Sequence, residues 1–156
     1  MKVRAVKKED FDDIFKLQLQ LEDAESVFDD NLKYHSYDTR KGKIKLRKRI
    51  VNPNNIFLVA ENENKKIIGF IDGFVPEDEW WYNEKVAYIS HICVDINYRN
   101  QGIGTNLMKK FEKKAMKNNI IGLRLLAFPN NKPAITLYKN CGFEEYSTYY
   151  YKKFNR

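Results

Sequence analysis

The chain has 156 residues, 43% of them hydrophobic, which is enough apolar material for the core of one domain of ordinary size. It contains no apolar run of the roughly 18 residues that a membrane-spanning helix needs, and its N-terminus lacks the apolar segment of a signal peptide. The two cysteines stand in no metal-binding spacing, so we expect a cytoplasmic protein with reduced thiols, no metal and no membrane partner.

The formal net charge of +7 is distributed unevenly along the chain. Glu9 to Asp30 is strongly acidic, with Lys16 as its one basic residue, whereas most residues from Arg40 to Arg49 are basic. The basic stretch is typical of a solvated helix face, and contact with nucleic acid or another anionic partner is the alternative.

The first half of the chain alternates between strand-like and helical patterns. Acidic residues stand at the start of the first helical stretch, as the helix dipole favours, and a polar Asn-Pro-Asn-Asn run ends the second. In chain order, the patterns predict a strand over 2–6, a helix from Phe11 through Leu21, a helix over about 39–51, and a hairpin of strands over 56–61 and 67–75.

The second half begins with a polar and aromatic loop over 76–84, followed by a strand of nearly all apolar residues, as in the middle of a sheet. In chain order, the patterns then predict a strand over 86–94, a turn over 95–101, a helix over 102–117, a strand over 120–128, a helix over 130–140 capped by Gly142, and one or two tyrosine-rich strands over 145–154. No repeat or linker divides the chain, so the order of elements predicts one α/β domain over 1–156.

The segment from Val94 to Thr105 joins a buried strand to a helix through a glycine-rich turn. Without a Cβ, Gly102 and Gly104 would let a phosphate approach the backbone, and the unpaired amides of the first helical turn would point at it. Arg99 adds a permanent positive charge. We therefore predict a phosphate site, with close packing as the alternative role of the glycines. The glycine spacing fits neither the Walker nor the dinucleotide motif.

Two motifs in this part of the chain resemble those of the GNAT-superfamily N-acetyltransferases. The Arg-x-x-Gly-x-Gly pattern of Arg99 to Gly104 is similar to the family's CoA-pyrophosphate signature, and the stretch from Asn131 to Phe143 is similar to its second motif. The resemblance implies a transferase that moves the acetyl group of acetyl-CoA to a primary amine in a ternary complex. It also implies the GNAT fold, an α/β domain with a mixed, mostly antiparallel sheet of six to seven strands and about four flanking helices.

The resemblance further implies which residues hold acetyl-CoA. Amides of the turn would bind the pyrophosphate, the preceding strand would pair with the pantetheine arm, and Asn131, or Asn130 in its place, would hydrogen-bond that arm. A bulge in the strand would aim the amide of Cys93 or Val94 at the thioester carbonyl as an oxyanion donor. The implied cofactor contacts are Ile92, Cys93, Val94, Arg99, Asn100, Gln101, Gly102, Ile103, Gly104, Thr105, Asn130, Asn131 and Tyr138.

Tyr138 is the catalytic residue that the resemblance implies, with its hydroxyl near the sulfur of acetyl-CoA. A phenol titrates near 10 and a thiol near 8.5, so Tyr138 would be protonated at neutral pH and could give its proton to the leaving thiolate. A core tyrosine at helical spacing is the alternative.

The sequence does not identify the general base. Strand alternation predicts that Tyr88 and Ser90 share the acceptor-facing side of Ile92, and that His91 points the opposite way. Since neither Tyr88 nor Ser90 is a good base, we expect Glu79 or Glu84 to take the proton through a water molecule. Ordinary solvated carboxylates are the alternative for these two residues.

The aromatic loop is the predicted contact for the acceptor, which we expect to be a small-molecule or peptide amine. Aromatic rings beside carboxylates attract an organic cation. The alternative is that the tryptophans pack at the edge of the sheet or in a homodimer. The expected substrate contacts are Trp80, Trp81, Tyr82, Tyr88 and Ser90.

Two functions of other classes stay open at this stage. A GNAT-fold regulator would bind acyl-CoA without transferring the acyl group. A basic nucleic-acid-associated protein would use the stretch from Arg40 to Arg49, although the sequence has no helix-turn-helix or aromatic RNA-binding pattern.

Overall fold

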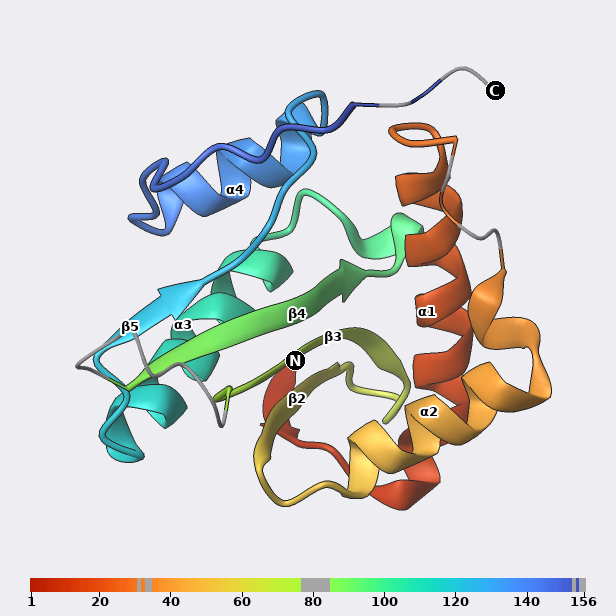
Figure 1. The fold of residues 1–156 in the computed structure, drawn as a ribbon. Coiled ribbons are helices and arrows are strands. Elements are labelled where there is room, and N and C mark those ends of the chain that lie inside the picture. The colour runs from red at the N-terminus through yellow and green to blue at the C-terminus, as the bar shows by residue number, and fades with distance from the viewer. Residues whose placement is uncertain (31, 33–34, 77–84, 153, 155–156) are drawn as a thin grey trace.

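The computed structural model describes residues 1–30, 32, 35–76, 85–152 and 154. Its centre is an open sheet of five strands in the order β1-β2-β3-β4-β5 (Figure 1). The first four strands run antiparallel to their neighbours, and β5 runs parallel to β4. The strands are β1 (Lys2–Ala5), β2 (Asn55–Glu61), β3 (Ile67–Phe74), β4 (Val86–Val94) and β5 (Gly122–Arg124).

Helices cover both faces of this sheet (Figure 1). One core cluster lies between the sheet and the pair α1 and α2, where α1 buries Ile14 and Leu17. The other lies under α3, which buries Leu107 and Phe111 and carries α4 at its side. The helices are α1 (Phe11–Ser26), α2 (Arg40–Val51), α3 (Ile103–Lys117) and α4 (Lys132–Asn140), with short 3₁₀ turns η1 (Lys8–Asp10), η2 (Ser36–Asp38) and η3 (Ile96–Tyr98).

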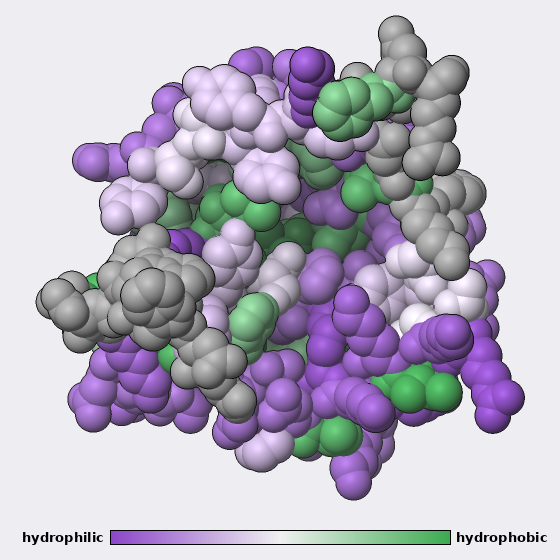
Figure 2. Space-filling model, in the orientation of Figure 1, coloured by the Kyte–Doolittle hydropathy of each residue, from purple (hydrophilic) through white to green (hydrophobic). Residues whose placement is uncertain are grey.

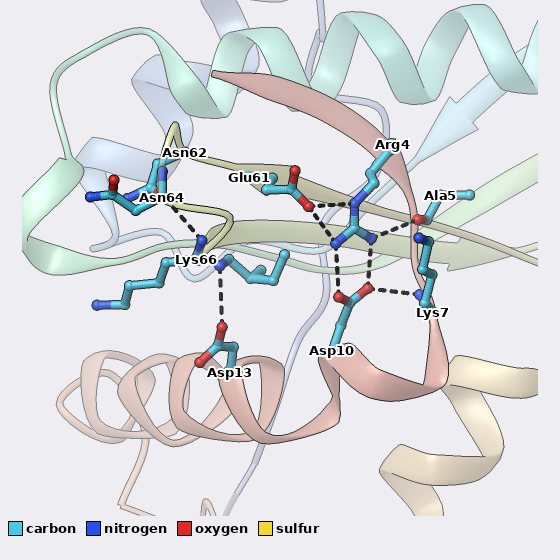
Figure 3. Close-up of polar contacts among 10 residues, drawn as sticks. Arg4, Ala5, Lys7, Asp10, Asp13, Glu61, Asn62, Asn64 and Lys66 are labelled. Atoms are coloured by element: carbon cyan, nitrogen blue, oxygen red, sulfur yellow. Dashed lines mark hydrogen bonds and ion pairs between the residues drawn. The ribbon is translucent and has the colours of Figure 1, made fainter.

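Arg4 ties the first strand to the start of α1 (Figure 3). Its guanidinium donates to the two carboxylate oxygens of Asp10 at 2.7 and 2.8 Å, and to Glu61 of β2 at 2.7 Å. Asp10 also accepts from the Lys7 amide at 2.7 Å. Burial alone would raise the pKa of Asp10, but the hydrogen bonds from Arg4 and Lys7 hold that pKa below its ordinary value.

The structure corrects the predicted strands near the C-terminus. The sheet has five strands rather than six or seven, because no described residue of the predicted 145–154 strands lies in a strand. That tyrosine-rich segment lies along α4 instead, with Tyr149 and Tyr150 exposed (Figure 1). The strand predicted over 120–128 shrinks to Gly122–Arg124. A strand-like composition forms a strand only where a neighbouring strand offers backbone partners.

A β-bulge in β4 changes which side chains face the acceptor side of the sheet. Asp72 pairs with His91 and Gly73 pairs with Ile89, so Ser90 has no partner in β3. One extra residue reverses the alternation of side chains beyond it. Tyr88 and His91 therefore share the face covered by α1 and α2. The prediction that His91 points away from the face of Tyr88 is wrong for this reason.

Ile92 lies on the opposite face from these two residues. It packs with the core under α3, as Ile89 does on the other side of the bulge. The centre of the Tyr88 ring lies 6.2 Å from that of Phe74 in β3. Phe74 is on the same face of β3 as Asp72, two positions earlier, which binds Arg49 of α2. Tyr88 and His91 therefore lie on the face covered by α1 and α2, and Ile92 lies on the face covered by α3.

Candidate functional site

The sheet splits between β4 and β5. The two strands pair only over Val86–Tyr88 and Gly122–Arg124, after which β4 continues to Val94 while the chain beyond β5 turns toward α4. Figure 2 shows the surface hollowed in this region, between α4 and β4, with hydrophobic residues on the floor of the hollow. The split leaves one edge of a central strand open to a ligand.

The open edge of β4 presents the backbone of alternate residues. The amide of Asp95 donates to Ile68 of β3 at 2.9 Å, so the amides and carbonyls of Val94 and Ile92 point away from β3. Arg99 donates from Nε to the Val94 carbonyl at 3.1 Å on this side. A linear ligand with amide groups could therefore pair with Ile92 and Val94 as an additional strand.

The side chain of Cys93 points to the face of the sheet that α1 covers, and not along this open edge. It pairs with Phe70 of β3, and its thiol donates to the Leu17 carbonyl of α1 at 3.3 Å. Burial raises the pKa of this thiol to about 12, so Cys93 stays protonated and unreactive. Of the two amides predicted as oxyanion donors, that of Val94 faces the split and that of Cys93 faces β3.

The turn before α3 has the backbone shape of an anion site. Asn100 and Gly102 adopt left-handed conformations, with φ of 61° and 73°, and Gly102 caps the helix without a side-chain hydrogen bond. Among the described residues, no acceptor binds the amides of Ile103, Gly104 and Thr105. No heavy atom lies within 4 Å of where a Gly102 Cβ would stand, so the space beside Gly102 at the start of α3 is open.

The second glycine of the turn has a different role. A Cβ on Gly104 would lie 3.2 Å from a methyl group of Leu137 in α4 and 3.9 Å from Val94. Gly104 therefore lets α4 pack closely on the start of α3. Two roles were predicted for the glycines. Gly102 fits the first, which is to leave room for a phosphate, and Gly104 fits the second, which is close packing.

Asn131 begins α4 and is already engaged by it. Its Oδ1 accepts from the Ala134 amide at 3.2 Å as the helix N-cap, which leaves the side-chain Nδ2 free to donate among the described residues. Asn130 is exposed in the turn before it, and its carbonyl accepts from the Lys132 amide at 2.9 Å. The partly buried Asn131 is thus the better placed of the two for a ligand in the split.

Tyr138 lies on the inner side of α4, partly buried against the α3 core, with its ring 6.1 Å from that of Phe143. Burial and the negative charge of Glu25 raise its pKa to about 12. The hydroxyl therefore remains a hydrogen-bond donor across the whole physiological pH range.

The C-terminal end of α1 closes the split from the other side. Phe28, just beyond the helix, stacks on Phe128 of the segment after β5 with ring centroids 5.8 Å apart. One turn earlier, Glu25 is partly buried, and burial raises the pKa of its carboxyl while His91 opposes the rise. The sequence showed the acidic character of this stretch but gave no reason to select Glu25.

Asp72 stands at the centre of a buried polar network under the acceptor face. It is 2% exposed and receives two hydrogen bonds from Arg49, at 3.0 and 2.6 Å, and one contact from His91 Nδ1 at 3.1 Å. Arg49 also donates to Tyr37 at 2.8 Å and to Gln18 at 3.2 Å. Burial would raise the pKa of Asp72, but His91 and the charge of Arg49 hold it below its ordinary value.

Sequence analysis missed this network, although one signal was present. Asp72 is the single charged residue of an otherwise apolar and glycine-containing strand, and a buried carboxylate requires a partner. The identity of that partner, Arg49, could not be seen because it lies 23 positions away within a run of basic residues.

Several predicted acceptor residues cannot be placed. Glu79, Trp80, Trp81, Tyr82 and Glu84 lie outside the described residues. Tyr88 and Ser90 are partly buried on β4. Within the described part of the chain, no group of three or more His, Cys, Asp or Glu side chains could hold a metal ion, and no helix is long and apolar enough to cross a membrane.

Known proteins with similar sequences and structures identify the family of this chain. Residues 17–143 match the model of the Acetyltransferase (GNAT) family. An uncharacterised N-acetyltransferase of Methanocaldococcus jannaschii is 32% identical over 147 residues. The matched region covers 92% of this chain but only 60% of that relative. The thialysine N-epsilon-acetyltransferase of Mus musculus is 26% identical over 92% of this chain and 84% of its own length.

A solved structure shares the whole fold. A mutant BH1408 protein from Bacillus halodurans superposes with a TM-score of 0.88 at 18% identity, over 99% of this chain and all of that one. That likeness extends the shared architecture beyond residues 17–143 to both ends of the chain. The chain therefore belongs to the GNAT family of acetyltransferases.

Proposed function

We propose that the protein transfers the acetyl group of acetyl-CoA to a primary amine by direct attack within a ternary complex. The observation that carries this proposal is the split between β4 and β5, which opens beside the unbonded amides at the start of α3. Acetyl-CoA offers a partner to each feature, since its pantetheine arm carries amide groups and its pyrophosphate is an anion.

The donor side of the reaction follows from the geometry of the split. The amides from Ile103 to Thr105 bind the pyrophosphate, and Arg99 and the open space at Gly102 favour the anion. The edge of Ile92 and Val94 pairs with the pantetheine, and Nδ2 of Asn131 donates to it. The amide of Val94 stabilises the oxyanion that forms when the amine attacks the thioester carbon.

Tyr138 acts on the leaving group as a hydrogen-bond donor. Its pKa of about 12 makes full proton transfer to a thiolate of ordinary pKa, near 8.5, unfavourable by about 5 kcal/mol. A hydrogen bond to the thiolate needs no such transfer and strengthens as the carbon–sulfur bond breaks. The proton that the nitrogen loses as it becomes an amide then neutralises the thiolate.

The acceptor is a primary amine that carries positive charge when free in solution. The name of the mouse relative specifies an N-epsilon amine, which supports an alkyl-amine acceptor. We propose that Trp80, Trp81 and Tyr82 contact it, with Glu79 and Glu84 nearby. A small molecule and a peptide both present such an amine.

The basic helix α2 gives little support to nucleic-acid binding, because part of its charge serves the fold. Lys43 forms an ion pair with Asp38 at 2.8 Å, and the Arg47 guanidinium lies 4.0 Å above the centre of the Phe11 ring. Arg49 is committed to Asp72. These contacts explain three of the basic residues without a polyanion.

A panel of primary amines, assayed for release of free thiol from acetyl-CoA, tests the proposed function. We expect thiol release with at least one alkyl amine and none without an amine. Tight binding of CoA with no thiol release across alkyl amines, amino sugars and peptide N-termini would instead identify a regulator. If the protein did not bind acetyl-CoA at all, both the transferase and the regulator would be excluded.

A further inference from the structure

His91 of β4 and Glu25 of α1 come from two elements that pack on each other, and neither is used by the donor machinery. His91 comes from β4, directly after the bulge at Ser90, and Glu25 comes from the last turns of α1. The charge of His91 lowers the pKa of Glu25, and the charge of Glu25 raises the pKa of Tyr138 on the opposite wall. Glu25 therefore lies within electrostatic range of both His91 on β4 and Tyr138 on α4.

His91 is held in one orientation and one tautomer. Its Nδ1 lies 3.1 Å from a carboxylate oxygen of Asp72, which two hydrogen bonds from Arg49 keep in place. Because Asp72 is ionised and can only accept, Nδ1 carries the hydrogen. In the neutral ring the lone pair is then on Nε2, and no described residue binds that nitrogen. This is the arrangement that a general base needs.

Glu25 is a carboxylate without a hydrogen-bond partner among the described residues. It lies seven residues, about two helical turns, after the buried Gln18, whose side chain accepts from Arg49, so the helix presents Glu25 on nearly the same side as Gln18. Its neighbour Glu22 differs, because it accepts from the Ser36 hydroxyl and from the Tyr37 amide at 3.3 Å. A partly buried carboxylate of this kind is a receptor for a cation.

We propose that His91 is the general base of the acetyl transfer, fixed by Asp72, and that Glu25 receives the acceptor as an ammonium ion beside it. This inference rests on the proposed function. The charged and titratable groups around the pair are Glu22 of α1, Tyr37 of η2, Arg49 of α2, Asp72 of β3, Cys93 of β4 and Tyr138 of α4.

The protons balance in this scheme. The ammonium gives one proton to Nε2 of His91, and the neutral nitrogen forms a bond to the acetyl carbon. The carbon–sulfur bond then breaks, and the second proton on the nitrogen passes to the thiolate that Tyr138 has stabilised. One proton per turnover leaves from His91 to solvent. The acceptor class that fits is a primary amine that is cationic at neutral pH.

The first test compares His91→Gln with the wild type on the most active primary amine of the thiol-release panel. The glutamine keeps a donor toward Asp72 but cannot take a proton, so we expect kcat to fall about 100-fold at pH 7. The deficit should shrink toward pH 10, where free amine is abundant, and added imidazole should restore part of the rate to His91→Ala. His35→Gln is the matched control, since His35 is also bonded to an aspartate, Asp23, at 2.9 Å.

The second test compares Glu25→Gln with the wild type. Since the carboxylate receives the ammonium, we expect KM for the amine to rise about tenfold or more while CoA affinity stays the same. Equal rates and pH profiles for wild type and His91→Gln would overturn the assignment of the base, and the same loss in Glu79→Gln or Glu84→Gln would place the base in the loop. An unchanged KM in Glu25→Gln would overturn the ammonium site.

These failures differ from failure of the proposed function. In that case the wild type itself would release no thiol with any amine, and neither variant would have a rate to lose. Binding of CoA to both variants, measured by calorimetry, confirms that each is folded around an intact donor site.

Discussion

At the scale of residues, Tyr138 and Asp72 have environments that suit the roles proposed for them. Tyr138 is kept protonated by burial and by Glu25, whereas Asp72 is kept ionised by Arg49 and His91. A hydroxyl that cannot lose its proton suits a leaving thiolate, and a carboxylate that cannot gain one suits the orientation of a histidine. The fold therefore provides both a hydrogen-bond donor, the Tyr138 hydroxyl, and a hydrogen-bond acceptor, the Asp72 carboxylate.

Replacing Tyr138 by Phe removes a hydrogen bond that matters mainly when thiolate charge develops. Hydrogen bonds to charged groups contribute about 1.5–3 kcal/mol, so we expect kcat to fall about 10- to 100-fold with CoA affinity little changed. Steady-state kinetics and calorimetry on the same preparation measure both. Tyr149→Phe, at an exposed position, is the control. A normal kcat in Tyr138→Phe would show that Tyr138 only packs in the core and does not assist the leaving group.

Asp10 makes the stability of the protein depend on acid pH. Its pKa is lower in the folded state than in the unfolded chain, so its contribution is complete above the unfolded pKa, near 4, and is lost as pH falls through the folded value. We expect Asp10→Asn to lower the free energy of unfolding by about 1–3 kcal/mol at pH 7 and to flatten its decline below pH 4. Urea unfolding at several pH values checks this.

The exposed Asp12, two residues further along the chain, provides the comparison for that measurement. Asp12→Asn should leave both the stability at pH 7 and its decline in acid unchanged within about 0.5 kcal/mol. If the two variants behaved alike, the ion pair of Arg4 with Asp10 would have no measurable share in stability.

At the scale of elements, the residues that α4 brings to the site depend on how α4 packs on α3. Gly104 permits this contact, because any larger side chain would meet Leu137. The position of α4 in turn sets the position of Tyr138 and of Asn131. The packing of these two helices outside the sheet therefore positions both residues.

Gly104→Val should displace α4 and lower the free energy of unfolding by about 1–3 kcal/mol through overpacking. The cost should be partly relieved in the double variant with Leu137→Ala, since the clash is with that side chain. Denaturant melts of the four members of this cycle measure the coupling. Additive losses would show that Gly104 and Leu137 do not interact.

At the scale of the whole molecule, the sequence predicted the elements with strong local signals. The apolar run of β4 has the predicted bounds, and α3 begins within one residue of its predicted start because Gly102 is its cap. The start of α1 was predicted, but the helix continues to Ser26 through polar residues that have no apolar periodicity. The turn from Arg99 to Gly104 could also be predicted, because its motif lies within a short stretch of sequence.

What the sequence could not show depends on pairing between distant segments. A bulge at Ser90 is visible only against β3, and it reverses the face of His91. The pairing of Asp72 with Arg49 requires α2 to lie over β3. The tyrosine-rich end has the composition of a strand, yet its described residues remain outside the sheet. The turn before α3 was therefore predictable from a local motif, and the side-chain contacts on the face covered by α1 and α2 were not.

Calorimetric titration of acetyl-CoA into the wild type, Gly102→Glu and Gly102→Ala tests the central claim most directly. Glutamate would fill the open space before the α3 amides with a negative charge, whereas alanine strains the same left-handed backbone without filling it. If acetyl-CoA binds in the split with its pyrophosphate on that turn, Gly102→Glu should weaken binding at least tenfold, about 1.4 kcal/mol, relative to a folded Gly102→Ala. Equal affinity for all three proteins would contradict the account.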